Sequence, residues 1–145
     1  MNTQTFRRFH DAVNSRSLDA IASAIDEAVA PDLVFHTRAP FSATGVDALK
    51  QVWVVLLRAF PDIHVAIEDE IAAGDKVVYR NTVTGTHLGE YRGIAPTGNP
   101  ISYDEIFIVR FAGGRIAELW GVVDVFAQLQ QIGAIHSPVA GGGPR

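Results

Sequence analysis

Cysteine is absent from this chain of 145 residues. Without thiols, a disulfide framework, a cysteine-ligated zinc or iron–sulfur site and a cysteine nucleophile are all excluded. Long apolar runs are also missing, since no stretch approaches the roughly 20 residues that span a membrane. Residues 1–5 lack the basic and then apolar order of a signal peptide. We therefore expect a cytoplasmic protein with no membrane partner.

Positive charge is in short supply, because 12 basic residues face 16 acidic ones and the formal net charge is -4. Nucleic acids and anionic membranes are held mainly by clustered lysine and arginine, so we expect neither as a partner. Hydrophobic residues, by contrast, make up 48% of the chain. At this length we expect one domain over residues 1–136 and a flexible tail over residues 137–145. The apolar surplus must line a core, a ligand cavity or a subunit interface.

The hydrophobic period changes from helical to strand-like near residue 62. Apolar residues at helical spacing predict helices over residues 3–14, 18–30 and 46–60, with a short strand over 32–37 between the last two. Alternating residues then predict strands from 63, over 76–87, over 101–111 and over 115–123, and a last short helix over 125–132. Helices followed by consecutive antiparallel strands predict an α+β fold. A curved antiparallel sheet wrapped around three helices would leave a concave internal pocket.

Asp124 is the most informative single residue. It follows the apolar strand that contains Trp120 and Val122, and Val125 and Phe126 come after it. A carboxyl group in apolar surroundings is harder to ionise, which suits it to proton transfer near neutral pH. Aspartate is also a preferred N-cap residue, and by position alone a role as the N-cap of the last helix is about as good an interpretation as a catalytic role. The two roles can coexist.

Glu105 is the second candidate, because it sits between apolar neighbours on a predicted central strand. A salt bridge to Arg80 on the adjacent strand is an equally good interpretation. Arg80 would otherwise hold a substrate carbonyl oxygen through its guanidinium. His36 would face the cavity as a donor or base, although a histidine at a strand end is more often an ordinary hydrogen-bonded residue.

The remaining histidines indicate no metal site, and the two tryptophans suit a core or a pocket wall. His10, His64 and His136 have no partner at metal-ligand spacing, so we expect no metal site, and no phosphate or dinucleotide motif indicates a cofactor. Trp53 and Trp120 suit a core or the wall of a pocket for an aromatic ligand. Because aliphatic residues occupy both faces of the strands, we expect the outer face to pair with a second copy in a homodimer.

Several linked motifs together resemble the SnoaL-like polyketide cyclases, also called ester cyclases. The resemblance covers nearly all of the chain before the tail and rests on Ala59-Phe60-Pro61-Asp62, Ala73-Gly74-Asp75-Lys76-Val77-Val78, Gly85-Thr86-His87-x-Gly89-Glu90, Gly93-Ile94-Ala95-Pro96-Thr97-Gly98 and Gly114-Arg115-Ile116-x-Glu118-x-Trp120-x-x-x-Asp124. It implies the α+β cone of the nuclear transport factor 2 superfamily, a deep pocket under the helices and a dimer packed through the outer sheet face.

The resemblance also implies a chemistry. In these cyclases an aspartate after the last-strand tryptophan drives an intramolecular aldol ring closure without metal or cofactor, and Asp124 matches it. The family also tends to use a histidine on the preceding strand, where this chain has none; Phe107 lies near that place, and Glu105 is the candidate substitute. Tyr103 with Glu105 would imitate ketosteroid isomerases, which share the fold.

A relative with the same fold, limonene epoxide hydrolase, needs an arginine and two aspartates. The matching places here are Arg80, Thr82 and Val122, so two of the three chemical groups are missing. The leading hypothesis is therefore a cofactor-independent cyclase or isomerase that acts on a small, mostly apolar carbonyl compound. The pocket would be lined by His36, Trp53, Arg80, Tyr103, Phe107, Trp120 and Val122. The alternative is a dimer domain that binds a small molecule without chemistry.

Overall fold

The computed structural model describes residues 2–37 and 43–135. Four helices and five strands follow one another in the order α1 (Asn2–Ser15), α2 (Leu18–Ala28), β1 (Val29–His36), α3 (Gly45–Ala59), β2 (His64–Ala73), β3 (Lys76–Thr86), β4 (Pro100–Ala112), β5 (Arg115–Val123) and α4 (Val125–Gln131). This confirms the predicted α+β class. The expected tail over residues 137–145 lies outside the described residues.

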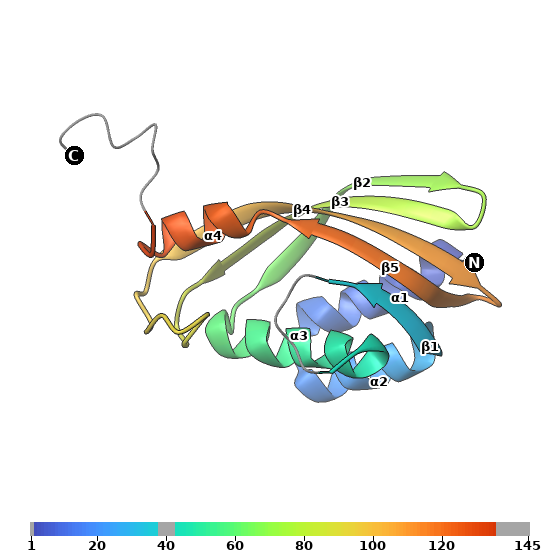
Figure 1. Cartoon of the computed structure of the whole chain (residues 1–145), viewed down its shortest axis with the longest axis horizontal. Coiled ribbons are helices and arrows are strands. Elements are labelled where there is room, and N and C mark those ends of the chain that lie inside the picture. The colour runs from blue at the N-terminus through green and yellow to red at the C-terminus, as the bar shows by residue number, and fades with distance from the viewer. Residues whose placement is uncertain (1, 38–42, 136–145) are drawn as a thin grey trace.

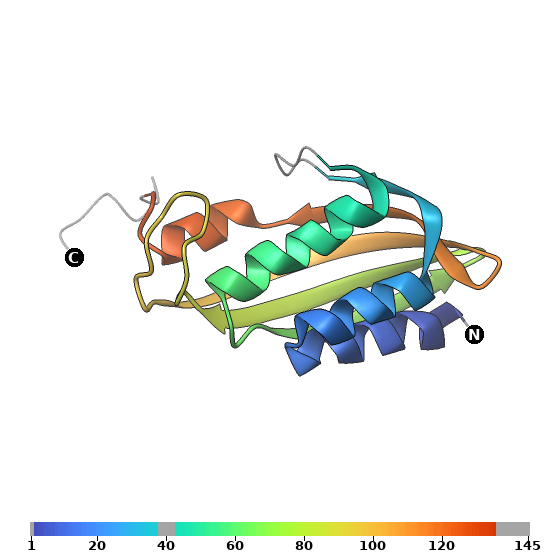
Figure 2. The ribbon, with the colours of Figure 1, turned by 90° about the horizontal axis from the view of Figure 1, so that it is seen from below.

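Helices α1, α2 and α3 cover one face of the sheet (Figures 1 and 2). Each buries an apolar stripe at helical spacing, as in Phe6, Phe9 and Val13 of α1. Helix α2 begins at the predicted cap Ser17, whose hydroxyl accepts a hydrogen bond from the Ala20 N–H at 3.2 Å. It ends at Ala28, and β1 begins at once, three residues earlier than the sequence predicts.

The sheet has the strand order β1-β5-β4-β3-β2. Strands β2 to β5 pair antiparallel, but β1 pairs parallel with β5, so the sheet is mixed and the prediction of a wholly antiparallel sheet is wrong at this edge. Helix α3 lies between β1 and β2 in the chain, whereas the two strands form opposite edges of the sheet. The connection through α3 therefore crosses one face of the sheet, from the edge at β1 to the edge at β2 (Figure 1).

A β-bulge decides which side chains of β5 face the helices. The pairing register changes from Phe111↔Ile116 to Arg110↔Glu118, which leaves Ala117 without a partner on β4. Ile116 and Leu119 both face the core as a result, and both are buried. A simple alternation from Ile116 assigns every later side chain of β5 to the wrong face.

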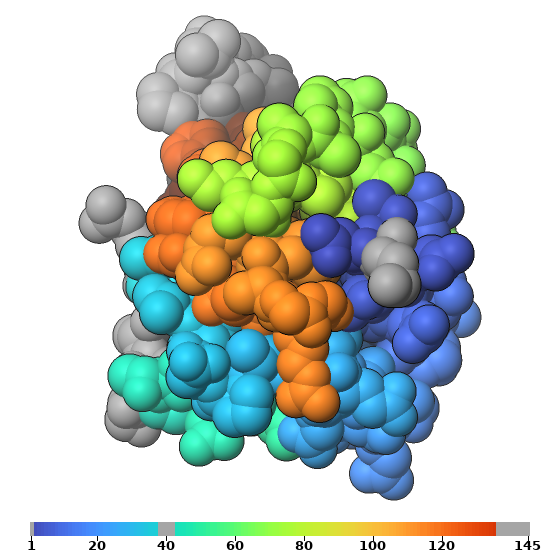
Figure 3. All heavy atoms as spheres, turned by 90° about the vertical axis from the view of Figure 1, so that its right-hand side faces the viewer, coloured from blue at the N-terminus to red at the C-terminus, as the bar shows by residue number. Residues whose placement is uncertain are grey.

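The ends of the two β-hairpins lie close together at one end of the molecule, beside α1 and β1 (Figure 3). The Thr5 hydroxyl donates a hydrogen bond to the Gly114 carbonyl at 3.3 Å and so ties α1 to the β4–β5 turn. Here the inner face of the sheet is sealed, since Val77, Val109 and Phe111 are all buried. The opposite end carries α4 and the loop over residues 87–99 (Figures 1 and 2).

The loop over residues 87–99 is held by a buried histidine and by α3. The His87 ring is fully buried, and its Nδ1 accepts a hydrogen bond from the Thr97 N–H at 3.2 Å. The N–H of Gly89 donates to the Ala59 carbonyl at 3.0 Å. This contact requires glycine, because a Cβ at position 89 would collide with the Arg58 carbonyl oxygen. The loop is therefore fastened to the last turn of α3.

Replacing Gly89 by alanine is expected to destabilise the protein through this collision between backbone atoms. The matched control is Gly74→Ala, at a hairpin residue with φ +60° and open space around its Cβ position, where the cost is the left-handed strain of about 1–2 kcal/mol. Urea denaturation should give a larger loss of unfolding free energy for Gly89→Ala than for Gly74→Ala. Equal losses would contradict the close approach.

Candidate active site

The inner face of the sheet changes from sealed to partly open along its strands. Beyond the sealed end, Glu105 and Phe107 of β4 and Val123 of β5 are only partly buried. Partly buried side chains of β1 and α3 pack against the same core, namely Phe35, Val46, Trp53 and Leu56. A carboxyl group therefore lies on a wall of apolar and aromatic side chains, and we take this region as the candidate site.

Among the described carboxyl groups, that of Glu105 has the pKa that departs most from its ordinary value. Burial raises the pKa of its carboxyl from an ordinary 4.5 to about 7, and a hydrogen bond from Asn81 opposes this in part. The Asn81 Nδ2 donates to Glu105 Oε2 at 2.9 Å. A carboxyl group with a pKa near 7 exists in both forms at neutral pH, so it can take a proton and return it.

Asn81 was not singled out from the sequence, although a signal was present. The buried positions of β3 alternate as Val77, Tyr79, Asn81 and Val83, and the amide interrupts an otherwise apolar and aromatic series. Asn81 is 2% exposed, and its Oδ1 has no hydrogen-bond partner among the described residues. A buried amide oxygen without a partner is rare, and here it places an unused acceptor on the residue that bonds to Glu105.

Tyr103 lies two residues before Glu105 on the same face of β4 and is also buried. Burial raises the pKa of its hydroxyl, and the charge of Glu105 raises it further. The phenol therefore keeps its proton and is a hydrogen-bond donor at all physiological pH values. Tyr103 and Glu105 together place a neutral donor beside a carboxyl group.

Phe107 forms the next part of the wall. Its ring lies over Gly121 of β5, the residue paired with it, and a Cβ at position 121 would collide with the ring atoms Cδ1 and Cε1. Trp53 of α3 lies edge-on to Phe9 with ring centroids 6.3 Å apart. Both aromatic side chains are partly buried and pack against the same core.

Asp124 does not lie in the apolar surroundings expected for it. Asp124 is exposed and is the N-cap residue of α4. Its Oδ1 accepts a hydrogen bond from the Ala127 N–H at 3.0 Å. Its own N–H donates to the Asp104 carbonyl at 3.1 Å. The capping interpretation is therefore confirmed. The strand ends one residue before Asp124, and the chain turns there into α4 rather than continuing along the inner face.

Trp120, Val122 and His36 lie on the outer face of the sheet, so the prediction that they line the pocket is wrong. The bulge at Ala117 is the cause for the two β5 residues. Val122 is 76% exposed. The His36 ring stacks on Trp120 with centroids 5.1 Å apart and an interplanar angle of 7°, and its Nε2 lies 2.7 Å from Glu118 Oε2.

Arg80 also points away from Glu105. It is exposed on the outer face, where its Nε donates to Asp69 Oδ2 at 2.6 Å. The predicted salt bridge between Glu105 and Arg80 is therefore wrong, because strand alternation puts residues 80 and 105 on opposite faces. The prediction that Arg80 binds a substrate in the pocket is wrong for the same reason.

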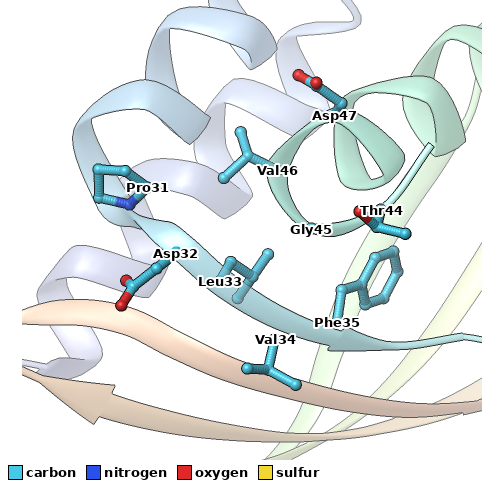
Figure 4. Close-up of a pocket in the computed structure, with 9 residues that line it drawn as sticks. All are labelled: Pro31, Asp32, Leu33, Val34, Phe35, Thr44, Gly45, Val46 and Asp47. Carbon is cyan, nitrogen blue, oxygen red and sulfur yellow. The ribbon is translucent and has the colours of Figure 1, made fainter.

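A groove of about 480 Å³ runs between β1 and the start of α3 (Figure 4). Leu33 and Phe35 project from β1 toward α3, whereas Val34 points away from it. Neither Glu105 nor Tyr103 lines this groove. We place the candidate site at Glu105 because the unusual chemistry lies there, while the polar side chains at the groove are exposed ones such as Asp32 and Asp47.

Within the described ranges, no cluster of three or more His, Asp or Glu side chains is arranged to hold a metal ion. Nor is any helix in this part of the chain both long and apolar enough to cross a membrane.

Comparison with known proteins now decides the family. Residues 3–132 match the family model of the SnoaL-like polyketide cyclases. The chain belongs to this family. No curated protein sequence matches it.

Solved structures of similar fold agree with this assignment. AclR of Streptomyces galilaeus, described as a candidate hydroxylase, has a TM-score of 0.81 and 28% identity over 96% of this chain and 86% of its own. IdmH of Streptomyces antibioticus, a candidate polyketide cyclase, has a TM-score of 0.76 and 29% identity over 92% of this chain and 99% of its own. A candidate polyketide cyclase of Bacillus cereus reaches a TM-score of 0.76 at 27% identity over 90% and 79% of the two chains.

The raised pKa of Glu105 makes the stability of this family member depend on pH. Between about pH 4.5 and 7 the folded protein keeps a proton on Glu105 that the unfolded chain has released, so the unfolding free energy falls as pH rises through this window. The full loss is roughly 3 kcal/mol. Glu105→Gln should abolish this loss in denaturation curves measured from pH 4 to 8, and Glu27→Gln, at an exposed residue of α2, should leave it in place. A constant difference between Glu105→Gln and the unsubstituted protein across this range would refute the raised pKa.

Proposed function

We propose that this protein is a cyclase or isomerase that moves a proton next to a carbonyl group of a small, mostly apolar compound, with Glu105 as the general acid and base. The observation that carries the proposal is the partly buried side chain of Glu105 among apolar and aromatic neighbours, whose carboxyl has a pKa of about 7. Such a group is half ionised at neutral pH, which is the best condition for proton transfer in both directions. Tyr103 supplies a neutral hydroxyl donor two residues away.

The first step takes a proton from the carbon beside the substrate carbonyl. The carboxylate of Glu105 accepts this proton and becomes a carboxylic acid. The electron pair of the C–H bond forms a C=C bond, and the π pair of the carbonyl moves to its oxygen to give an enolate. The Tyr103 O–H donates a hydrogen bond to that oxygen, where negative charge develops. The proton ends on Glu105 and the electron pair stays on the substrate, so this step needs no metal and no organic cofactor.

The second step differs between a cyclase and an isomerase. In a cyclase the enolate carbon attacks a second carbonyl carbon of the same molecule, and the new alkoxide takes the proton back from Glu105. In an isomerase the proton returns to a different carbon. The family and the polyketide cyclase names of neighbours such as IdmH favour the first course, with a polyketide-like substrate held against Trp53 and Phe107.

The alternative is a domain that binds the same class of compound without chemistry. The apolar wall would serve this role equally well, and the exposed position of Asp124 removes one of the two carboxyl groups expected in the pocket. The two functions differ in one measurable respect, because only the enzyme accelerates loss of a proton from the ligand.

Proton exchange tests the function without knowledge of the natural substrate. We expect the protein to accelerate deuterium uptake beside the carbonyl of aromatic ketones and β-keto esters, such as 2-tetralone, followed by NMR in D₂O. Glu105→Gln should slow this exchange by roughly 10²–10⁴-fold, the usual contribution of a positioned acid or base. Asp124→Asn should leave the rate nearly unchanged, because asparagine caps a helix as well as aspartate does.

Each other outcome has a definite meaning. Probes that bind, seen as chemical-shift changes of the protein, but exchange no faster than in buffer would establish the binding domain instead of the enzyme. Failure of every apolar carbonyl probe to bind would contradict the proposed substrate class. A large loss of rate in Asp124→Asn with little loss in Glu105→Gln would move the catalytic role to Asp124.

We also infer that a second copy of this chain covers the outer face of the sheet. Apolar side chains stand exposed there on two neighbouring strands, namely Ile106 and Ile108 of β4 and Val122 of β5, and Trp120 pairs with Ile108. Charges of both signs surround them, with Arg80, Lys76 and Arg110 near Asp69, Asp104 and Glu118. A face that is apolar at its centre and carries both signs of charge at its rim can pair with its own copy across a two-fold axis.

Sedimentation equilibrium tests the dimer. Val122→Asp puts a charge at a 76% exposed position, so it should leave the fold intact and convert the dimer to a monomer. Val54→Asp, at an exposed position of α3 away from the sheet, should remain dimeric. A monomeric unsubstituted protein would exclude the inference, and so would a Val122→Asp variant that stays dimeric.

A further inference from the structure

The sheet itself fixes how the Asn81 amide lies relative to the Glu105 carboxyl. The two residues are directly opposite each other in the antiparallel pairing of β3 with β4, which puts their Cβ atoms about 4.5–5.5 Å apart on one face. Both strands are interior strands of the sheet. The hydrogen bond from Asn81 Nδ2 to Glu105 Oε2, 2.9 Å long, therefore joins two side chains whose backbones are held on both sides.

This hydrogen bond makes the two oxygens of the Glu105 carboxyl different. The amide nitrogen is a donor only, so it fits an oxygen that carries no proton. Oε2 meets this condition in the ionised carboxylate, and it also does so in the acid when the proton is on Oε1. Among the residues that the structure describes, none donates a hydrogen bond to Oε1. The bond can therefore persist in both states of Glu105, with the proton coming and going at Oε1.

The amide at position 81 has a cost for the fold. Asn81 is 2% exposed between the buried Tyr79 and Val83, and its Oδ1 has no hydrogen-bond partner among the described residues. A buried acceptor without a partner lowers stability, whereas leucine, of similar volume, would occupy the site without that cost. The bond to Glu105 is the interaction that asparagine makes here and an apolar side chain cannot make.

We propose that Asn81 is a positioning residue, which binds Oε2 of Glu105 and so makes Oε1 the oxygen that exchanges the proton with the substrate. This inference rests on the proposed function, because it names the reacting atom of the general acid and base. Asn81 acts through Glu105 and takes no proton itself. Since its N–H donates to the carboxyl, it also favours the ionised form and opposes the effect of burial on the pKa of Glu105.

The other groups near Glu105 leave the sign of this effect unambiguous. On β4 the titratable neighbour is Tyr103, whose phenol stays neutral because burial raises its pKa. The residue opposite Glu105 on β5 is Val123, and the residue opposite Asn81 on β2 is Ile67, both apolar. Burial and the bond from Asn81 set the pKa of the Glu105 carboxyl, with no contribution from a charged side chain of the described residues. Loss of the amide donor must therefore raise this pKa.

The first test titrates Glu105 through its ¹³Cδ NMR signal, without any substrate. Asn81→Leu should raise the midpoint by about one to two pH units, the effect of one hydrogen bond to a charged group. Asn81→Asp keeps the shape of the side chain but puts a second carboxyl beside the first, so the upper midpoint of the pair should also lie above that of the unsubstituted protein. The control Val77→Ala opens a cavity at the sealed end of the same strand and should leave the midpoint in place.

The second test separates orientation of the carboxylate from its basicity. The pH profile of 2-tetralone exchange, corrected for exchange in buffer, gives the limiting kcat of each variant with Glu105 fully ionised. A base of higher pKa removes a proton faster when the geometry is unchanged, so a lower limiting rate reports lost orientation. Asn81→Leu should lower the limiting kcat about tenfold, the effect of about one hydrogen bond, with KM unchanged. Val77→Ala should keep the rate of the unsubstituted protein.

The possible failures can be told apart. A midpoint of Glu105 that stays in place without the amide overturns the inference, even if exchange occurs, and Asn81→Asp decides this should Asn81→Leu not fold. Equal shifts in Asn81→Leu and Val77→Ala also overturn it, since they assign the effect to a loosened sheet. So does a limiting kcat in Asn81→Leu at or above that of the unsubstituted protein. A protein that binds ketones without exchange refutes the proposed function, and the titration still decides whether Asn81 holds Glu105.

Discussion

One desolvated carboxyl group sets the chemistry of the candidate site. Glu105 lies on the inner face of a central strand with one hydrogen bond, from Asn81, and burial holds its pKa near 7. The groups around it take their roles from this fact. Its charge helps to keep the Tyr103 hydroxyl protonated, and the partly buried Phe107 lies on the same face of the strand. With an ordinary pKa of 4.5, the Glu105 carboxyl would be almost fully ionised at neutral pH and could not act as an acid there.

The bulge in β5 decides which side chains of this strand lie on the inner face of the sheet and which lie on the outer face. It turns Leu119 and Gly121 inward, where Gly121 leaves room for the Phe107 ring, and it turns Trp120 and Val122 outward. The inner face then holds the acid–base group and its aromatic wall. The outer face holds an apolar patch with mixed charges at its rim, which suits a second copy of the chain.

Local patterns in the sequence predict most of the helices and strands of the fold. Helical stripes such as Phe6, Phe9 and Val13, the cap at Ser17 and the alternation of β3 and β4 predicted nearly all elements within a few residues, because short-range periodicity reports directly which face is buried. The parallel pairing of β1 escaped prediction because it depends on contacts between distant segments. The sequence did not predict which side chains of β5 face the helices, because one unpaired residue, Ala117, reverses the alternation without any local signal. That single reversal misplaced Trp120 and Val122, while Asp124 follows the end of the strand and caps α4.

The candidate site was predicted in part for the same reason. Glu105, Tyr103 and Phe107 lie on one strand without a bulge between them, so alternation alone placed them on one face. Asn81 comes from the neighbouring strand β3, and only the pairing of β3 with β4 shows that it meets Glu105. The most direct test of the account is the pKa of Glu105 itself, measured by NMR titration of its ¹³Cδ signal with Glu105→Gln for assignment. We expect a midpoint of about 7, and a midpoint near the ordinary 4.5 would contradict the role of Glu105 as acid and base.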